Sequence, residues 1–217
     1  MNDPFETGKQ SLLAARISHP YLAIMFIETE TTPNPSSLKF LPGRTVMPSG
    51  TREFSSPEAA EASPLAQAIF DTGEVVNVFF GWDFVSVTAA PGTDWSALKA
   101  QVVSILLDHF VSEAPLFVGG SADGINVPAE DEAMVVEDRE EDAETIAAIH
   151  ELLETRVRPA VAGDGGDIAY RGFSDGIVYL SLQGACSGCP SSTATLKHGI
   201  ESLLKHYVPE VVEVRAA

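Results

Sequence analysis

Apolar and polar residues alternate, or recur at helical spacing, along most of the first half of the chain. The segments with strand character are residues 25–29, 38–41, 75–80 and 84–88. Gly81-Trp82-Asp83 separates the last two, a pattern typical of a hairpin. Ser63 is expected to cap a helix that ends near Gly73, and Asp94 to cap a second helix with apolar side chains every three or four residues. The order ββαββα predicts an α+β domain over residues 25–115.

The second half contains the same kinds of element in a different order. Apolar residues at i, i+3, i+7 and i+11 predict one face of a helix; they are Ile146, Ile149, Leu153 and Val157. Arg158-Pro159 is expected to end this helix. The remaining pattern predicts two strands, a helix and a last strand, at residues 168–170, 177–182, 190–207 and 211–214. The order αββαβ over residues 143–217 gives the fold class as α+β, with two small α/β-sandwich domains.

Composition and charge are those of a globular chain with an acidic middle. Of the 217 residues, 45% are hydrophobic and 20% are charged. The net charge is −18, and residues 119–145 contribute half of it with ten acids and one base. Such a stretch is typical of a solvated linker, which we place at residues 116–142. An acidic chain repels nucleic acid, and no apolar run reaches the ~18 residues of a membrane span, so neither partner is expected.

The first 24 residues fit neither domain. They carry Asp3 and Glu6 against Lys9 and Arg16, whereas a signal peptide begins with a basic region and a mitochondrial presequence is rich in Arg and poor in acids. Met25 stands directly before the first expected strand. Residues 1–24 are therefore expected to be a disordered extension, or to precede the true start of the protein.

The chain contains two cysteines, Cys186 and Cys189, in the loop Gly184–Pro190. Four-thiolate zinc sites and iron–sulfur clusters normally take four protein ligands. One chain therefore offers half of such a site, and a second copy is the simplest source of the other half. A redox dithiol of the thioredoxin kind and an inert structural pair are the alternatives. With so few cysteines, a reducing intracellular compartment is expected.

The cysteine loop joins the end of a strand to the start of a helix. Cys189 precedes Pro190, so its sulfur is expected near unpaired helix N–H groups, which favour the thiolate and lower a cysteine pKa. Gly184 and Gly188 let the backbone curl around a bulky inorganic group, because glycine accepts a positive φ. The second half offers too few strands for a thioredoxin-like sheet, and this favours metal binding over redox chemistry.

Other polar residues give weaker signals. Asp164-Gly165-Gly166-Asp167 could offer carboxylates to a cation, but two acids that flank two glycines are more typical of a turn. The candidate histidine ligands His150, His198 and His206 are expected to be solvated side chains. Trp82 and Phe84 of the hairpin are expected in the core. No Ser/His/Asp set has a meaningful spacing, so no catalytic residues and no enzyme active site are expected.

Two sets of motifs resemble a known family. Gly163-Asp164-Gly165-Gly166-Asp167-Ile168, followed by Gly184–Ser192, resembles the C-terminal domain of NifU-like proteins. Glu30-Thr31-Thr32-Pro33-Asn34-Pro35, followed by Leu38–Gly43, is similar to the N-terminal domain of the Nfu type. The two matches occur in the order of the family and together cover nearly all of residues 25–214.

The resemblance implies a non-enzymatic iron–sulfur cluster scaffold or carrier. Such proteins bind a [4Fe–4S] cluster between two subunits and pass it to apo-enzymes; carried over, Cys186 and Cys189 would be its ligands. Upstream cluster-assembly proteins would be the donors, apo iron–sulfur proteins the acceptors, and the N-terminal domain an interaction module. The expected location is the bacterial cytoplasm, or the mitochondrion or plastid of a eukaryote. A dithiol–disulfide oxidoreductase and a zinc-bridged structural dimer are the alternatives.

Overall fold

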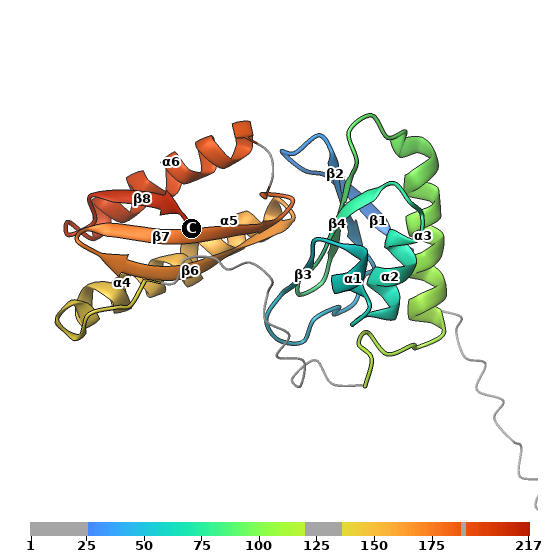
Figure 1. The fold of residues 1–217 in the computed structure, drawn as a ribbon, viewed down its shortest axis with the longest axis horizontal. Coiled ribbons are helices and arrows are strands. Elements are labelled where there is room, and N and C mark those ends of the chain that lie inside the picture. The colour runs from blue at the N-terminus through green and yellow to red at the C-terminus, as the bar shows by residue number, and fades with distance from the viewer. Residues whose placement is uncertain (1–25, 120–135, 188–189) are drawn as a thin grey trace, which may run out of the picture.

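The structure is a computed structural model that describes residues 26–119, 136–187 and 190–217. Within these ranges the chain forms two units, each with its own sheet and its own apolar core (Figure 1). This confirms the α+β fold class. The expected extension at residues 1–24, and residues 120–135 of the expected linker, lie outside the described residues. None of the helices in the described ranges is both long and apolar enough to span a bilayer.

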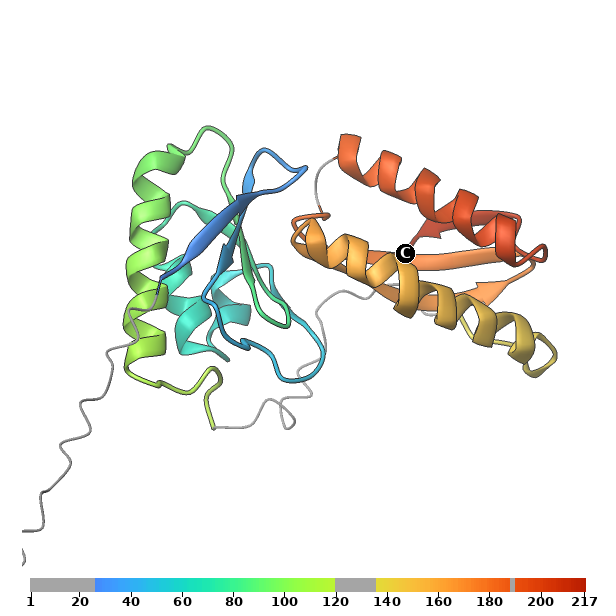
Figure 2. The ribbon, with the colours of Figure 1, turned by 180° about the vertical axis from the view of Figure 1, so that it is seen from behind.

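The N-terminal unit is an antiparallel five-stranded sheet of order β1-β2-β5-β4-β3 with helices on one face (Figure 2). Its strands are β1 (Glu28–Thr31), β2 (Ser37–Leu41), β3 (Arg52–Phe54), β4 (Val75–Phe80) and β5 (Val85–Ala89). Its helices are α1 (Pro57–Ala60), α2 (Pro64–Phe70) and α3 (Trp95–Val111). The sequence pattern did not predict β3 and α1, because three and four residues are too few to show a period.

Side-chain caps start the two longer helices at the expected residues. Ser63 Oγ accepts a hydrogen bond from the Ala66 N–H at 3.3 Å, and Asp94 Oδ1 accepts one from the Ser96 N–H at 2.9 Å. Each cap satisfies a backbone donor that the first turn leaves unpaired. Gly73 follows α2 with a φ of +81°, a conformation that glycine adopts without strain.

The first core lies between the helices and one face of this sheet. Alternate residues of β5 enter it, together with one face of α3; they are Val85, Val87, Ala89, Leu98, Val102 and Leu106. Phe84 is buried as expected, but Trp82 is 58% exposed, because it belongs to the turn beyond the last paired residues Phe80 and Val85. Leu116 and Phe117, which we had placed in the linker, pack on the first core.

The C-terminal unit has a three-stranded sheet of order β6-β7-β8, with its long helices on one face (Figure 2). Its strands are β6 (Gly166–Ser174), β7 (Ile177–Gly184) and β8 (Glu213–Ala216). Its helical segments are η1 (Glu140–Asp142), α4 (Ala143–Leu152), η2 (Leu153–Val157), α5 (Arg158–Gly163) and α6 (Pro190–Tyr207). β6 and β7 are antiparallel, whereas β7 and β8 are parallel and joined by α6.

The first helical stretch of this unit does not end at Arg158-Pro159, so that prediction is wrong. α4 continues through the π-helical segment η2 into α5, and Pro159 falls in the first turn of α5. At that position a missing N–H costs little, and the wider π turn leaves room for the ring. The predicted apolar face is confirmed, because Ile149, Leu153 and Val157 are buried in the second core.

Candidate functional site

The cysteine loop follows β7 at the end of the C-terminal unit that faces the N-terminal unit (Figure 1). Gly184 turns the chain with a φ of +68°. The Ala185 N–H then donates to the Gly165 carbonyl at 3.1 Å, which holds the loop against the turn before β6. Cys186 is only 4% exposed. Cys189 lies outside the described residues, so the structure places one of the two expected ligands.

Contacts from two elements position Cys186, one at its sulfur and one at its backbone carbonyl. A Cβ on Gly166 would lie 2.9 Å from Cys186 Sγ, closer than real Cβ contacts come, so the sulfur occupies space that only a glycine at position 166 leaves free. From α6, the Thr193 hydroxyl donates to the Cys186 carbonyl at 3.2 Å. The start of β6 and the first turns of α6 therefore determine together where the thiol lies.

The electrostatic setting of Cys186 favours the protonated thiol. Burial first, and then the carboxylates of Asp164 and Asp167, raise its pKa to about 11. The lowered pKa was expected for Cys189, which lies outside the described residues, so it stays a prediction. That expectation rested on the place of Cys189 beside the helix start, whereas Cys186 lies earlier in the loop, in apolar surroundings and near two negative charges. A metal ion that binds Cys186 must displace a firmly held proton.

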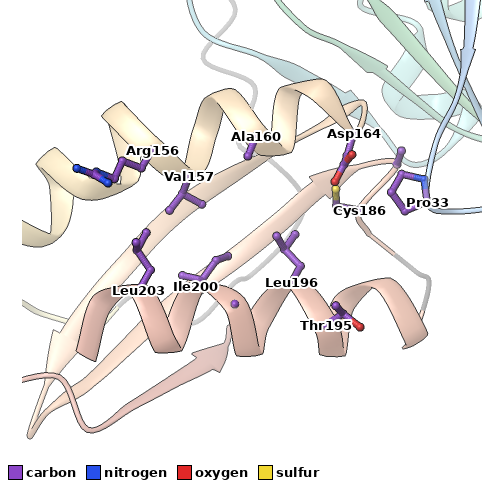
Figure 3. A pocket seen from close by; sticks show the side chains of 12 residues that line it. Pro33, Arg156, Val157, Ala160, Asp164, Cys186, Thr195, Leu196, Ile200 and Leu203 are labelled. Carbon is purple, nitrogen blue, oxygen red and sulfur yellow. The ribbon is translucent and has the colours of Figure 1, made fainter. Parts of the chain in front are cut away.

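A cavity of about 660 Å³ opens beside Cys186, between the η2–α5 stretch and α6 (Figure 3). Its walls are mainly aliphatic; they include Val157, Ala160, Leu196, Ile200 and Leu203. At one end Figure 3 shows Cys186 with Asp164 and with Pro33, which comes from the N-terminal unit. The cavity thus offers one thiol, one carboxylate and an apolar shell.

The described part of one chain does not complete a metal site. Among the described residues there is no group of three or more His, Cys, Asp or Glu side chains arranged to hold a metal ion. The turn expected at residues 164–167 is confirmed for Asp164 and Gly165, which follow α5 with a φ of +83° at Gly165, whereas Gly166 and Asp167 begin β6. Asp167 forms an ion pair with Arg158 at 3.2 Å and accepts a hydrogen bond from the Thr51 hydroxyl at 3.0 Å.

The three histidines singled out in this unit lie away from the thiol. The His150 and Tyr170 ring centroids are 4.4 Å apart, and those of His206 and Tyr207 are 4.8 Å apart. His198 is exposed on α6. None of the three lines the cavity beside Cys186.

The N-terminal unit supplies contacts to this site that the sequence reasoning did not identify. Five of its side chains bond to the cysteine loop or to the Gly163–Asp167 turn: Asn34, Lys39, Thr51, Glu53 and Ser86. Sequence features could have identified two of these five residues. Asn34 belongs to one of the quoted motifs, and Ser86 is polar between Val85 and Val87, so it marks the second face of the sheet.

Each half of the chain matches a known protein family. Residues 27–113 match the family described as "Scaffold protein Nfu/NifU N terminal", and residues 149–215 match "NifU-like domain". The two matches follow one another along the chain, as the motif resemblance implies.

Curated proteins align over most of the chain. "NifU-like protein 5, mitochondrial" and "NifU-like protein 4, mitochondrial" from Arabidopsis thaliana are each 51% identical over 189 residues, 86% of this chain, but only 66% and 64% of their own lengths. The chain thus spans just under two thirds of these relatives. "NFU1 iron-sulfur cluster scaffold homolog, mitochondrial" from Homo sapiens is 44% identical over 97% of this chain and 83% of its own length.

Proposed function

The chain belongs to the family of NifU-like proteins with an Nfu-type N-terminal domain, and from this premise we propose that it is an iron–sulfur cluster scaffold or carrier. Two copies share a [4Fe–4S] cluster, each through Cys186 and Cys189, and the dimer passes the cluster to apo-proteins. The human relative, by its name a cluster scaffold, supports the general role. The cluster type, the dimer and the transfer are the parts that we propose here.

The observation that carries the proposal is the ligand deficit around Cys186. Within the described residues its thiol joins no group of metal-ligating side chains, and the chain has only one further cysteine. A cluster that needs four thiolates must then draw on another molecule. Two identical loops related by a twofold axis supply four in the simplest way.

The cavity fits such a cargo. Its walls are mainly aliphatic, and such a shell suits an inorganic core whose ligands are soft thiolates. The raised pKa of Cys186 keeps an empty site in the thiol form, so binding of iron is accompanied by release of a proton. A buried thiol of this kind is a poor nucleophile, which counts against the dithiol–disulfide oxidoreductase.

A carrier of this kind is not an enzyme: it binds and releases a cargo. Its partners are a second copy, cluster-assembly proteins that donate and apo iron–sulfur proteins that accept. For location, the three relatives described above are mitochondrial by name. Their names support the mitochondrial alternative, and they give no support to the bacterial cytoplasm that we had expected first.

Anaerobic reconstitution with iron and sulfide tests the proposal. We expect about two irons per chain, a brown protein with a cluster absorption band, and a dimer by light scattering. Cys186→Ser and Cys189→Ser should each abolish stable loading, because either change leaves two thiolates per pair of chains. Ser191→Ala, a change of similar size just beyond the second cysteine, is the control.

The other outcomes separate the alternatives. A loaded protein that stays monomeric without an added thiol contradicts the shared cluster. A colourless dimer that contains zinc and no acid-labile sulfide identifies the zinc-bridged dimer. A monomer that reduces insulin disulfides at a rate that depends on both cysteines identifies the oxidoreductase.

A further inference from the structure

The second face of the N-terminal sheet lies against the cysteine end of the C-terminal unit. In both views the helices of the N-terminal unit cover one face of its sheet, and the C-terminal unit lies beside the opposite face (Figures 1 and 2). Residues that alternate with the first core point to this side. Phe79 of β4 and Ser86 of β5 are among them, and both are almost fully buried without belonging to the first core.

Glu53 of β3 is the central contact. Its carboxylate accepts a hydrogen bond from the Gly184 N–H at 2.8 Å. The Ser187 hydroxyl, which donates to the Gly184 carbonyl at 2.8 Å, lies 3.4 Å from the same carboxylate, so Glu53 contacts the loop on both sides of Cys186. Asn77 of β4 donates to the same oxygen at 2.9 Å and so orients the carboxylate. Hydrogen bonds to a charged group are roughly twice as strong as neutral ones.

The turn between β1 and β2 reaches the residue before the cysteine. Asn34 Nδ2 donates to the Ala185 carbonyl at 3.2 Å, while Asn34 Oδ1 accepts from the Ser36 N–H at 3.0 Å. The bond to Ser36, within the same turn, holds the Asn34 side chain in place. Less entropy is therefore lost when Asn34 bonds to Ala185. Pro33, the preceding residue, lines the cavity at the end where Cys186 lies (Figure 3).

Two glycines let the units approach this closely. A Cβ on Gly165 would lie 2.7 Å from Ser86 Oγ, and a Cβ on Gly184 would lie 2.9 Å from Phe79 Cδ1. Ser86 Oγ also donates to the Gly165 carbonyl at 2.6 Å. A side chain at either position would clash with the N-terminal unit. The two units are therefore packed as closely here as residues in a protein interior.

From these contacts we infer that the second face of the N-terminal sheet is an interaction surface for the cysteine loop, and that it caps the loop in the empty protein. The inference rests on the proposed function only in taking Cys186 as a cluster ligand. A shared cluster needs the loops of two copies to face each other. The cap occupies one side of that loop with Glu53, Asn34 and Pro33, so capping and pairing of two copies compete.

The competition has a defined concentration dependence. Capping is intramolecular and does not depend on protein concentration, whereas pairing of two copies does. Both copies must be uncapped to pair, so if only a fraction of the molecules is uncapped, the concentration needed for pairing rises by the square of the reciprocal of that fraction. Release of the cap by an acceptor or donor that binds the same sheet face would then couple partner binding to cluster transfer.

The test measures the accessibility of Cys186 in the reduced, metal-free full chain, by iodoacetamide alkylation with quantification of each cysteine by mass spectrometry. The variants are Glu53→Gln, Asn34→Ala and the two combined. We expect the double variant to alkylate Cys186 about tenfold faster than the unmodified chain, because a charge-assisted bond and a buried amide bond are lost together. Circular dichroism shows that each variant is folded.

Glu61→Gln is the matched control, since Glu61 is exposed at the end of α1, on the helical side of the sheet. Its rate should equal that of the unmodified chain. A folded double variant within about twofold of the unmodified rate overturns the cap, and so does an equal rise in the control. The assay needs no cluster, so faster alkylation in a protein that takes up no iron removes the proposed function and leaves the cap in place.

Discussion

The two faces of the N-terminal sheet are buried in different ways. One face contributes aliphatic and aromatic side chains to the first core under α1, α2 and α3. The other presents Glu53, Ser86 and Lys39 to backbone groups of the C-terminal unit, with Phe79 among them. Adjacent residues of one strand therefore enter either a hydrophobic core or a hydrogen-bonded contact between units.

The two faces of the sheet therefore have different roles, one in the stability of the N-terminal unit and one in its contact with the C-terminal unit. Burial of a large apolar surface stabilises the N-terminal unit without directional constraints. Hydrogen bonds contribute only about 0.5–1.5 kcal/mol each, or about 1.5–3 kcal/mol to a charged group, once water is counted, so a contact made of a few of them and one buried phenylalanine is weaker than the first core. The helical face thus maintains the fold, and the polar face suits a contact that forms and breaks.

Phe79 and Phe80 provide the largest test, since they are neighbours on β4, both fully buried, and on opposite faces. Phe80→Ala should lower the free energy of unfolding of the N-terminal unit by about 3–5 kcal/mol. Phe79→Ala should lower it by only about 1–2 kcal/mol, because Phe79 lies outside the first core, between Phe84 and Gly184 of the other unit. Urea unfolding followed by tryptophan fluorescence measures this, since both tryptophans, Trp82 and Trp95, lie in that unit. Equal losses of unfolding free energy in the two variants would show that both faces contribute equally to the stability of the N-terminal unit.

Gly184 gives a smaller effect at the contact. Gly184→Ala places a Cβ 2.8 Å from the Gly165 carbonyl at a φ of +68°, so we expect a loss of about 1–3 kcal/mol in the C-terminal unit and faster alkylation of Cys186. Gly199→Ala is the control, because nothing lies within 4 Å of a Cβ at that position of α6. There alanine should stabilise the helix by about 0.5–1 kcal/mol. Hydrogen exchange of the two units measures both changes, and a stabilising Gly184→Ala would contradict the close approach.

The smallest expected effect is a pH dependence of stability that comes from His109, a buried residue of α3. Burial, and then the charge of Arg44, lower its pKa below the ordinary value. The unfolded chain therefore takes up a proton as the pH falls below about 6.5 while the folded unit does not, and stability decreases. His109→Gln should reduce this decrease. Urea midpoints at pH 7.5 and 5.5 for both proteins measure it, and an unchanged difference would exclude His109 as its source.

Much of the fold follows from local rules in the sequence. The caps at Ser63 and Asp94, the hairpin of β4 and β5, and the helix that begins at Pro190 lie where the pattern predicts them. Each depends on neighbouring residues alone. The helix end expected at Pro159 was wrong because the helix continues through a π-helical turn directly before the proline, whose residues Leu153 and Val157 are buried in the second core.

The site was less predictable, for a related reason. Its cysteines are evident from spacing, but the raised pKa of Cys186 depends on burial and on Asp164 and Asp167, whose positions require the folded loop. The contacts of Asn34 and Glu53 join residues more than 130 positions apart. Strand alternation shows that a second face exists; it does not show what covers that face.

The chain enters the C-terminal unit far from the cysteine. The Val136 N–H donates to the Arg171 carbonyl at 2.9 Å, and Asp138 accepts from the Tyr170 hydroxyl at 2.7 Å and from the Phe173 N–H at 2.9 Å. Phe173 lies seven positions after Gly166 in β6, roughly 20 Å along the strand. A rotation about this pivot of about 30° would swing the loop through roughly 10 Å. A hinge motion at this entry point would therefore displace the cysteine end of β6 far more than the end beside Val136.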